Sequence, residues 1–188
     1  MSRVQNMQRD QARSEIKEIY DKIEENGAKV LNLYRVLAHN PNLLRNFLRL
    51  GSSLLARTEL SPKLRELAIL RVARLAGSEY EWAQHYLIAL EVGVSPEQTE
   101  AISHWNDSTS FNDIERAVLQ YTEEVSQNVE VKDETFRALR QHLDEQSIVE
   151  LTLSIGYWGM VARLLVALQV DIDIQSISSV QELIGRKS

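Results

Sequence analysis

Cysteine is absent from the 188 residues of this chain. Its absence excludes disulfides, thiolate metal sites, iron–sulfur clusters and every catalytic cycle that uses a thiol. Glycine and proline are scarce as well, with seven and three residues, where a combined share of roughly 12% is usual. Sandwiches and barrels need many tight turns, so this scarcity of turn residues predicts a mostly helical protein.

Basic residues are fewer than acidic ones, 21 against 27, which gives a net charge of −6. Binding to nucleic acid or to anionic membranes needs a concentrated basic face, and the sequence has no such cluster. The longest charge-free apolar stretch, residues 151–162, is shorter than the about twenty residues that a membrane-spanning helix needs. The N-terminal residues are polar and lack the apolar run of a signal peptide. We therefore expect a cytoplasmic protein without a nucleic-acid or membrane partner.

The sequence does contain apolar residues at helical spacing, between recognisable start and stop signals. Ser61-Pro62 predicts an N-cap followed by a first-position proline, and Gly77 predicts a left-handed helix end. Three segments fit the capping-box pattern, residues 78–81, 95–98 and 112–115. The predicted helices cover residues 11–25, 28–39, 43–57, 61–76, 78–92, 95–105, 112–127, 133–142 and 144–170, with a short terminal helix over 177–184.

Pro41 is expected to stop the second of these helices, and no strand pattern of comparable strength occurs. We therefore predict a single all-α domain over residues 1–188, with N-terminal helices in 1–57, core helices in 58–127 and C-terminal helices in 128–188. The last long helix is apolar almost all round, as is typical of a helix buried in a core or between subunits. Such an excess of apolar surface predicts an obligate homo-oligomer.

Glu66 is a carboxylate on an otherwise apolar helical face. The residues three, four and seven positions later on that face are Ile69, Leu70 and Ala73. A carboxylate among apolar neighbours must find a partner or have a raised pKa. Two interpretations stand side by side: a structural glutamate, favoured by the helix dipole or paired with Lys63, and a functional carboxylate.

Ser78, Glu81 and His85 share one face of the next helix, because they are three and four residues apart. Glu81 can hydrogen-bond to His85 at this spacing, which fixes the imidazole tautomer and makes an acid–base unit beside the apolar Trp82. The structural interpretation is that Ser78 and Glu81 are the two halves of a capping box. Metal-ligand spacings such as HExxH are absent from the sequence, so no metal site and no cofactor are predicted.

Arg163 interrupts the most apolar helix of the chain. An arginine in such a place usually pairs with a buried or interfacial carboxylate, or extends its charged end to solvent. It can also receive a substrate carboxylate in a bidentate fork. Both interpretations remain open on the sequence alone.

Residues 60–102, which contain the stretch EYEWAQH, resemble the carboxymuconolactone decarboxylase family, which includes alkyl hydroperoxidase D. Residues 32–55 look like the N-terminal helices of its longer members, and residues 160–173 look like their final helix. The resemblance implies an alkyl hydroperoxidase D-like helical bundle, assembled as a homotrimer or hexamer.

The motif of the peroxidase branch is Glu, eleven residues, then Cys-x-x-Cys-x-x-x-His. Laid on this chain, the motif matches Glu66 and His85 and places Ser78 and Glu81 at the two cysteine positions. A serine hydroxyl and a carboxylate cannot run a dithiol cycle, so thiol peroxidase activity is not expected.

What the resemblance leaves is acid–base chemistry. We expect decarboxylation or a related lyase or isomerase step on a small carboxylated or lactone-like molecule. Glu66, Glu81 and His85 are the candidate catalytic residues, converging in one pocket between the helices of residues 61–76 and 78–92. The candidate substrate-binding residues are Ser78, Trp82 as part of the pocket wall, and Arg163. The alternative is a non-catalytic, ligand-binding helical oligomer, which the loss of both cysteines favours.

Overall fold

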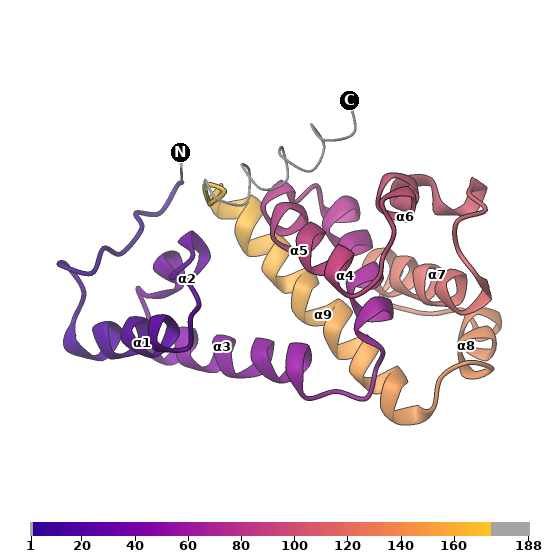
Figure 1. Ribbon diagram of the computed structural model, residues 1–188, viewed down its shortest axis with the longest axis horizontal. Helices are drawn as coiled ribbons and strands as arrows, with labels where there is room; N and C mark the ends of the chain where they lie inside the picture. Colours follow the sequence, from indigo (N-terminus) through magenta and orange to yellow (C-terminus); the bar gives the residue numbers. More distant parts are fainter. Residues whose placement is uncertain (1, 174–188) are drawn as a thin grey trace.

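The computed structural model describes residues 2–173, and every regular element in them is a helix (Figure 1). The all-α class is therefore confirmed, while the short helix predicted over residues 177–184 lies outside the described residues. The elements are α1 Ser14–Glu25, α2 Asn32–Leu37, α3 Pro41–Ala56, α4 Pro62–Ala76, α5 Glu79–Glu91, α6 Pro96–Ala101, the 3₁₀ helix η1 Ile102–Asp107, α7 Asp113–Asn128, α8 Asp133–Arg140 and α9 Glu145–Leu168.

The boundary between α2 and α3 differs from the prediction. The second helix begins at Asn32 rather than near residue 28, and Pro41 starts the third helix as well as following the second. The side chain of Asn40 accepts hydrogen bonds from the backbone N–H groups of Asn42 and Leu43, both at 3.1 Å. Asn40-Pro41 is thus an N-cap with a first-position proline, so Pro41 marks the start of a helix and not only the predicted stop.

Most of the other helix signals behave as predicted. Gly77 ends α4 in the left-handed conformation, with φ of +64°. The capping boxes at Ser95 and Asn112 are complete. Ser61 precedes α4, but its side chain makes no capping hydrogen bond.

Helix α4 is the centre of the main core and packs against α5, α7 and α9. Its residues Leu67, Ala68, Ile69 and Leu70 are each at most 1% exposed, so this helix is buried on more than one face. Burial of a large aliphatic side chain stabilises a fold by roughly 1.5–3 kcal/mol. The main core therefore holds α4 rigidly, together with any functional group that it carries.

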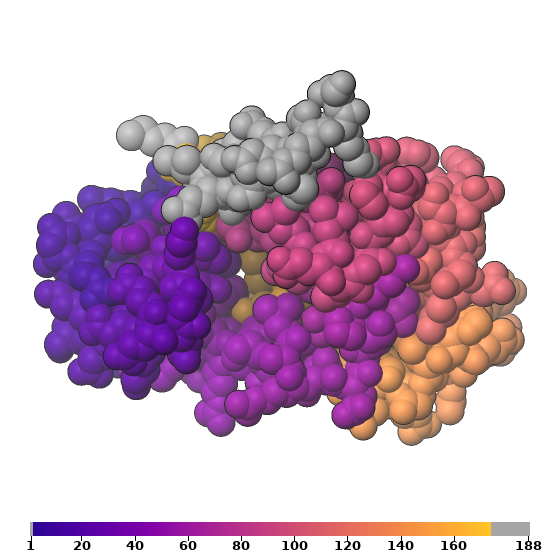
Figure 2. All heavy atoms as spheres, viewed as in Figure 1, coloured from indigo at the N-terminus to yellow at the C-terminus, as the bar shows by residue number. Residues whose placement is uncertain are grey.

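Helices α1, α2 and α3 form an N-terminal lobe with a smaller apolar cluster of its own, which includes Ile16, Tyr20 and Leu44. In Figure 1 this lobe lies on one side of the bundle, and α3 runs from it toward α9. The backbone N–H of Arg3 donates to the carbonyl of Leu168 at 2.8 Å, which fastens the N-terminal arm to the end of α9. In Figure 2 the surface is hollowed between this lobe and α4–α5, and atoms of α9 are visible at the bottom of the hollow.

Helix α9 is long and apolar enough to cross a membrane by length and composition alone. One face of it packs against α4, α7 and the N-terminal lobe, as in a core helix. Its opposite face exposes several apolar side chains: Val149, Leu153, Met160 and Val166. The helix is apolar almost all round, as predicted, and 44% of its most apolar 18-residue window is buried among the described residues.

Candidate active site

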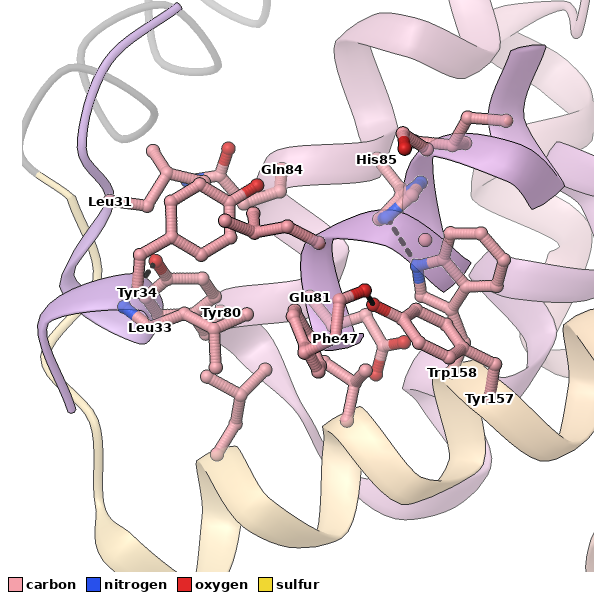
Figure 3. Close-up of a pocket in the computed structure, with 16 residues that line it drawn as sticks. Leu31, Leu33, Tyr34, Phe47, Tyr80, Glu81, Gln84, His85, Tyr157 and Trp158 are labelled. Atoms are coloured by element: carbon pink, nitrogen blue, oxygen red, sulfur yellow. Dashed lines mark hydrogen bonds between the residues drawn. The ribbon is translucent and has the colours of Figure 1, made fainter. Parts of the chain in front are cut away.

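A pocket of about 180 Å³ lies between the N-terminal lobe and the main bundle (Figures 2 and 3). Its walls come from four helices: α2 and α3 on the side of the lobe, and α5 and α9 on the side of the bundle. Aromatic and aliphatic side chains dominate them, and none of the described lining residues is a lysine or an arginine. The aromatic residues are Tyr34, Phe47, Tyr80, Tyr157 and Trp158.

Tyr157 anchors the aromatic wall to the N-terminal lobe. Its hydroxyl donates to the carbonyl oxygen of Phe47 at 2.9 Å, and the centroids of these two rings are 5.1 Å apart. The ring crosses α3 at Gly51, where a Cβ atom would lie only 2.5 Å from the tyrosine oxygen. Burial raises the pKa of Tyr157, so its hydroxyl stays protonated and remains a donor.

A second set of hydrogen bonds joins the start of α2 to α5. The Asp173 carboxylate accepts from the hydroxyl of Tyr80 and, at 3.0 Å, from the backbone N–H of Asn32 at the start of α2. The Tyr80 oxygen in turn accepts from the backbone N–H of Leu33 at 3.2 Å. These bonds hold α2 against α5, so the lobe and the bundle present their pocket walls in a fixed relation.

His85 is held by one partner on each ring nitrogen. Its Nδ1 lies 2.7 Å from Oε2 of Glu66, and its Nε2 lies 2.7 Å from Nε1 of Trp158. An indole N–H can only donate, so Nε2 is the acceptor and carries no proton. Nδ1 of the neutral ring therefore carries the proton and donates it to Glu66. The three side chains form one hydrogen-bonded chain from α4 through α5 to α9.

Glu66 stands behind His85 and does not line the pocket. The residue is fully buried, and its second oxygen lies 3.5 Å from Nε of the buried Arg65. Lys63, the partner proposed by the structural interpretation, binds Glu115 instead at 2.6 Å. The contact between Glu66 and His85 is as predicted, but the predicted pocket between α4 and α5 is wrong: no residue of α4 is among the pocket-lining residues, which include His85 and Glu81 from α5.

Glu81 is a pocket-lining carboxyl group without a hydrogen-bond partner among the described residues. The residue is 2% exposed, and neither carboxyl oxygen has a hydrogen-bond partner among residues 2–173. Burial raises the pKa of Glu81 well above its ordinary value, which favours the neutral carboxylic acid over the carboxylate. The predicted hydrogen bond between Glu81 and His85 is not formed, because both ring nitrogens are taken by Glu66 and Trp158.

The capping box predicted over residues 78–81 is only half formed. The hydroxyl of Ser78 accepts from the backbone N–H of Glu81 at a long 3.4 Å, and no bond returns from the Glu81 carboxyl. Ser78 is buried but is not among the residues that line the pocket. Its observed role is therefore to begin α5.

Trp82 and Arg163 lie elsewhere. The Arg74 guanidinium carbon lies 3.5 Å from the centroid of the Trp82 ring. The prediction that Trp82 forms part of the pocket wall is wrong, because Trp82 is not among the pocket-lining residues. Arg163 is exposed on α9, donates to the carbonyl of Gly159 at 2.8 Å, and borders a separate hollow. The difference arises because both side chains point away from the face of their helix that meets the N-terminal lobe.

Trp158 is the site residue that the sequence did not reveal. An aromatic pair at residues 157–158 of an apolar helix is most simply interpreted as packing, and its partner His85 is 73 residues away. No local spacing links the two. Among the described residues no group of three His, Asp or Glu side chains is placed to hold a metal ion.

Comparison with known proteins gives one family and one fold. Residues 41–124 match the model of the carboxymuconolactone decarboxylase family. The uncharacterized protein YnjA of Escherichia coli K12 is 31% identical over 127 residues, which cover 67% of this chain and 69% of YnjA.

Two solved structures share the fold over nearly the whole chain. One is a variant of the debrominase Bmp8 in complex with 2,3,4-tribromopyrrole, with a TM-score of 0.78, 22% identity, and coverage of 95% of this chain and 96% of that one. The other is an alkylhydroperoxidase AhpD core protein, an uncharacterized peroxidase-related protein of Ralstonia eutropha JMP134. Its TM-score is 0.81, with 18% identity and coverage of 93% and 94%. The predicted alkyl hydroperoxidase D-like fold is therefore confirmed.

Proposed function

The chain belongs to the carboxymuconolactone decarboxylase family, and we propose that it performs acid–base chemistry on a small neutral molecule bound in the pocket. Glu81 is the proton donor of this proposal. The observation that carries it is a carboxyl group that is 2% exposed, faces a pocket and has no partner among the described residues. A buried acid without partners is costly to keep in a fold, and such groups are concentrated at functional sites.

The walls favour an uncharged ligand. A substrate carboxylate would enter an apolar pocket whose described lining residues include no lysine or arginine, and would lose its water without gaining a counter-ion. Arg163, the cation that sequence reasoning offered, lies outside the pocket. Of the two substrate kinds expected from the sequence, the lactone-like kind therefore has the better support.

The volume favours a single ring. An engineered protein cavity of about 150 Å³ binds benzene, and the pocket of this chain measures about 180 Å³. The structural neighbour Bmp8 was solved with 2,3,4-tribromopyrrole, which is also a one-ring molecule. The proposed ligand is accordingly a small cyclic compound, such as a lactone or a cyclic enone.

A single carboxyl group is sufficient for the proposed chemistry. Glu81 donates its proton to the carbonyl oxygen of the ligand, and the resulting carboxylate takes a proton from a neighbouring carbon, which gives the enol and restores the acid. Protonation of the enol at a different carbon, with loss of the O–H proton, completes an isomerisation that needs no thiol. Glu66 and His85 are positioning residues in this scheme, because they fix the wall beside Glu81 and neither ring nitrogen of His85 is free.

The test is deuterium exchange at carbon. We expect the protein to catalyse exchange of the protons next to the carbonyl group of one-ring lactones and enones in D₂O, followed by NMR. Because general acid–base groups contribute roughly 10²–10⁴-fold, Glu81→Gln should reduce this rate by at least about a hundredfold. Thermal-shift titration of the same compounds and of their carboxylated analogues gives binding independently. Stabilisation by the carboxylated analogues alone would contradict the proposal.

The alternative function is ligand binding without turnover. It is favoured by the Trp158 indole, which occupies the imidazole nitrogen that would otherwise serve as a base. In that case the neutral compounds stabilise the protein and the exchange rate stays at the level of the buffer.

The proposal also includes the predicted homo-oligomer, a trimer or hexamer, in a cytoplasmic location. The exposed apolar face of α9, with Leu153 52% and Met160 48% exposed beside Gly156, supports an interface between copies of the chain. Light scattering at micromolar concentration measures the mass directly. A stable monomer would remove this part of the proposal.

A further inference from the structure

Trp158 lines the pocket and also donates its indole N–H to His85. Its indole nitrogen lies 2.7 Å from Nε2 of His85, and the two rings meet edge to face with an interplanar angle of 90°. His85 and Trp158 both line the pocket (Figure 3). The indole N–H therefore lies between the imidazole lone pair and any ligand that would compete for it.

We propose that Trp158 is a specificity-determining residue, which withdraws the His85 ring from the pocket and leaves recognition to Glu81. The inference rests on the proposed function, since it assumes that the pocket binds a small neutral molecule. The inference names the preferred class of ligand. The pocket prefers molecules that accept a hydrogen bond, such as lactones, esters and ketones, over molecules that must donate one to a ring nitrogen.

Two features hold Trp158 in this position. Its ring packs edge to face on Tyr157, with centroids 4.9 Å apart, and Tyr157 is itself anchored to the N-terminal lobe through Phe47. Glu66 fixes the other end of the chain, because it accepts from Nδ1 and so leaves the lone pair of His85 on Nε2. The imidazole is thus oriented with its acceptor toward the indole and away from a ligand.

Glu81 is the acidic residue among the pocket-lining side chains. The Glu81 carboxyl lines the same pocket, has no hydrogen-bond partner among residues 2–173, and in its protonated form donates an O–H there. A carbonyl oxygen satisfies that donor, whereas the N–H or O–H of a pyrrole or phenol finds the imidazole acceptor already used. Removing the indole N–H should therefore open an acceptor and change which ligands bind.

The first measurement needs no ligand and no variant of Trp158. Long-range ¹H–¹⁵N NMR distinguishes protonated from unprotonated imidazole nitrogens, and His85→Gln identifies the signals of this residue among the four histidines. We expect Nδ1 protonated and Nε2 unprotonated in the wild-type protein. A proton on Nε2 in the neutral ring would overturn the inference, even if every Trp158 variant failed to fold.

The second measurement compares phenol with fluorobenzene, which have similar shape and differ in the O–H group. In Trp158→Phe the affinity ratio of phenol to fluorobenzene should rise up to about tenfold over wild type, the worth of one hydrogen bond. The larger cavity affects both compounds alike and cancels in the ratio.

Trp105→Phe is the matched control, because the Trp105 indole donates to Glu123 at 2.6 Å and is not among the pocket-lining residues. Its ratio should equal that of wild type. Binding with an equal ratio in wild type and both variants would overturn the inference and leave the proposed function standing. Failure of lactones, enones and both test compounds to bind at all would instead remove the proposed function and the inference with it.

Discussion

The starts of α5 and α7 carry the same sequence pattern and have different structures. Each helix begins with a capping residue followed three positions later by a glutamate: Ser78 and Glu81 in α5, Asn112 and Glu115 in α7. In α7 the box is complete, with both reciprocal bonds at 3.0 Å. In α5 only the bond to the Ser78 hydroxyl is present, and it is 3.4 Å long.

The difference comes from what precedes each helix. Helix α4 ends at Ala76, two residues before Ser78, and the left-handed Gly77 lets the backbone N–H of Ser78 donate to the carbonyl of Ala73 at 2.9 Å. The donor that a capping glutamate would satisfy is already used. Asn112 follows a loop instead, and its backbone N–H donates to the Glu115 carboxylate. When the preceding helix accepts from the N–H of the N-cap residue, the glutamate three positions later is not needed as a cap and can make other contacts.

The two glutamates consequently differ in chemistry although both are nearly fully buried. Burial by itself would raise the pKa of Glu115, but hydrogen bonds from Lys63, from the backbone of Asn112 and from Gln98 lower it below its ordinary value. Glu81 has burial without these donors, and its pKa is raised. A buried carboxyl group with all its hydrogen-bond partners, such as Glu115, stabilises the fold, whereas one without partners, such as Glu81, can bind a ligand.

The same conservative substitution should therefore have opposite effects at the two sites. At pH 7, Glu115→Gln should lower the free energy of unfolding by about 2 kcal/mol, because charge-assisted hydrogen bonds are weakened. Glu81→Gln should raise it by about 1 kcal/mol, because an acid that favours its neutral form in the fold is replaced by a neutral amide. Urea denaturation followed by circular dichroism measures both. Destabilisation of equal size at the two sites would show that Glu81 is structural.

The pH dependence sharpens the contrast. A carboxyl whose pKa is raised in the fold contributes stability that is present below its unfolded value, 4.5 for Glu81, and is lost as the pH rises toward the folded value. Wild type should lose stability relative to Glu81→Gln above pH 4.5, by at most about 1.4 kcal/mol per pH unit.

Glu115 has the opposite sign, because its pKa is lowered in the fold. Its contribution is present above its unfolded value and is lost as the pH falls through the folded value. The curves of wild type and Glu115→Gln should therefore approach each other in acid. Parallel stability curves for wild type and Glu81→Gln between pH 4.5 and 8 would contradict the raised pKa of Glu81.

The smallest effects should come from the capping residues themselves. Asn112→Ala removes a well-formed cap and should cost about 1 kcal/mol. Ser78→Ala removes only the long 3.4 Å bond while the backbone bond of residue 78 to Ala73 remains, so it should cost a few tenths of a kcal/mol. Thermal unfolding of the two variants side by side provides the comparison. A larger loss for Ser78→Ala would mean that its hydroxyl has a second role.

These cases also mark how far the sequence alone can lead. The helices, the left-handed end at Gly77 and the meeting of Glu66 with His85 follow from periodicity, cap signals and the family motif. The state of Glu81 does not, because a capping-box pattern carries no record of whether its N-terminal donor is already taken. Trp158 could not be assigned either, since its bond to His85 depends on how α9 crosses α5.

The walls of the pocket come from both inside and outside the stretch that matches the family model, residues 41–124. Glu81 and His85 lie within it, whereas Tyr34 in α2 and Trp158 in α9 lie outside it. A match to the family model therefore leaves nearly half of the pocket wall unspecified, because substitutions in α2 or α9 would reshape the cavity without altering residues 41–124.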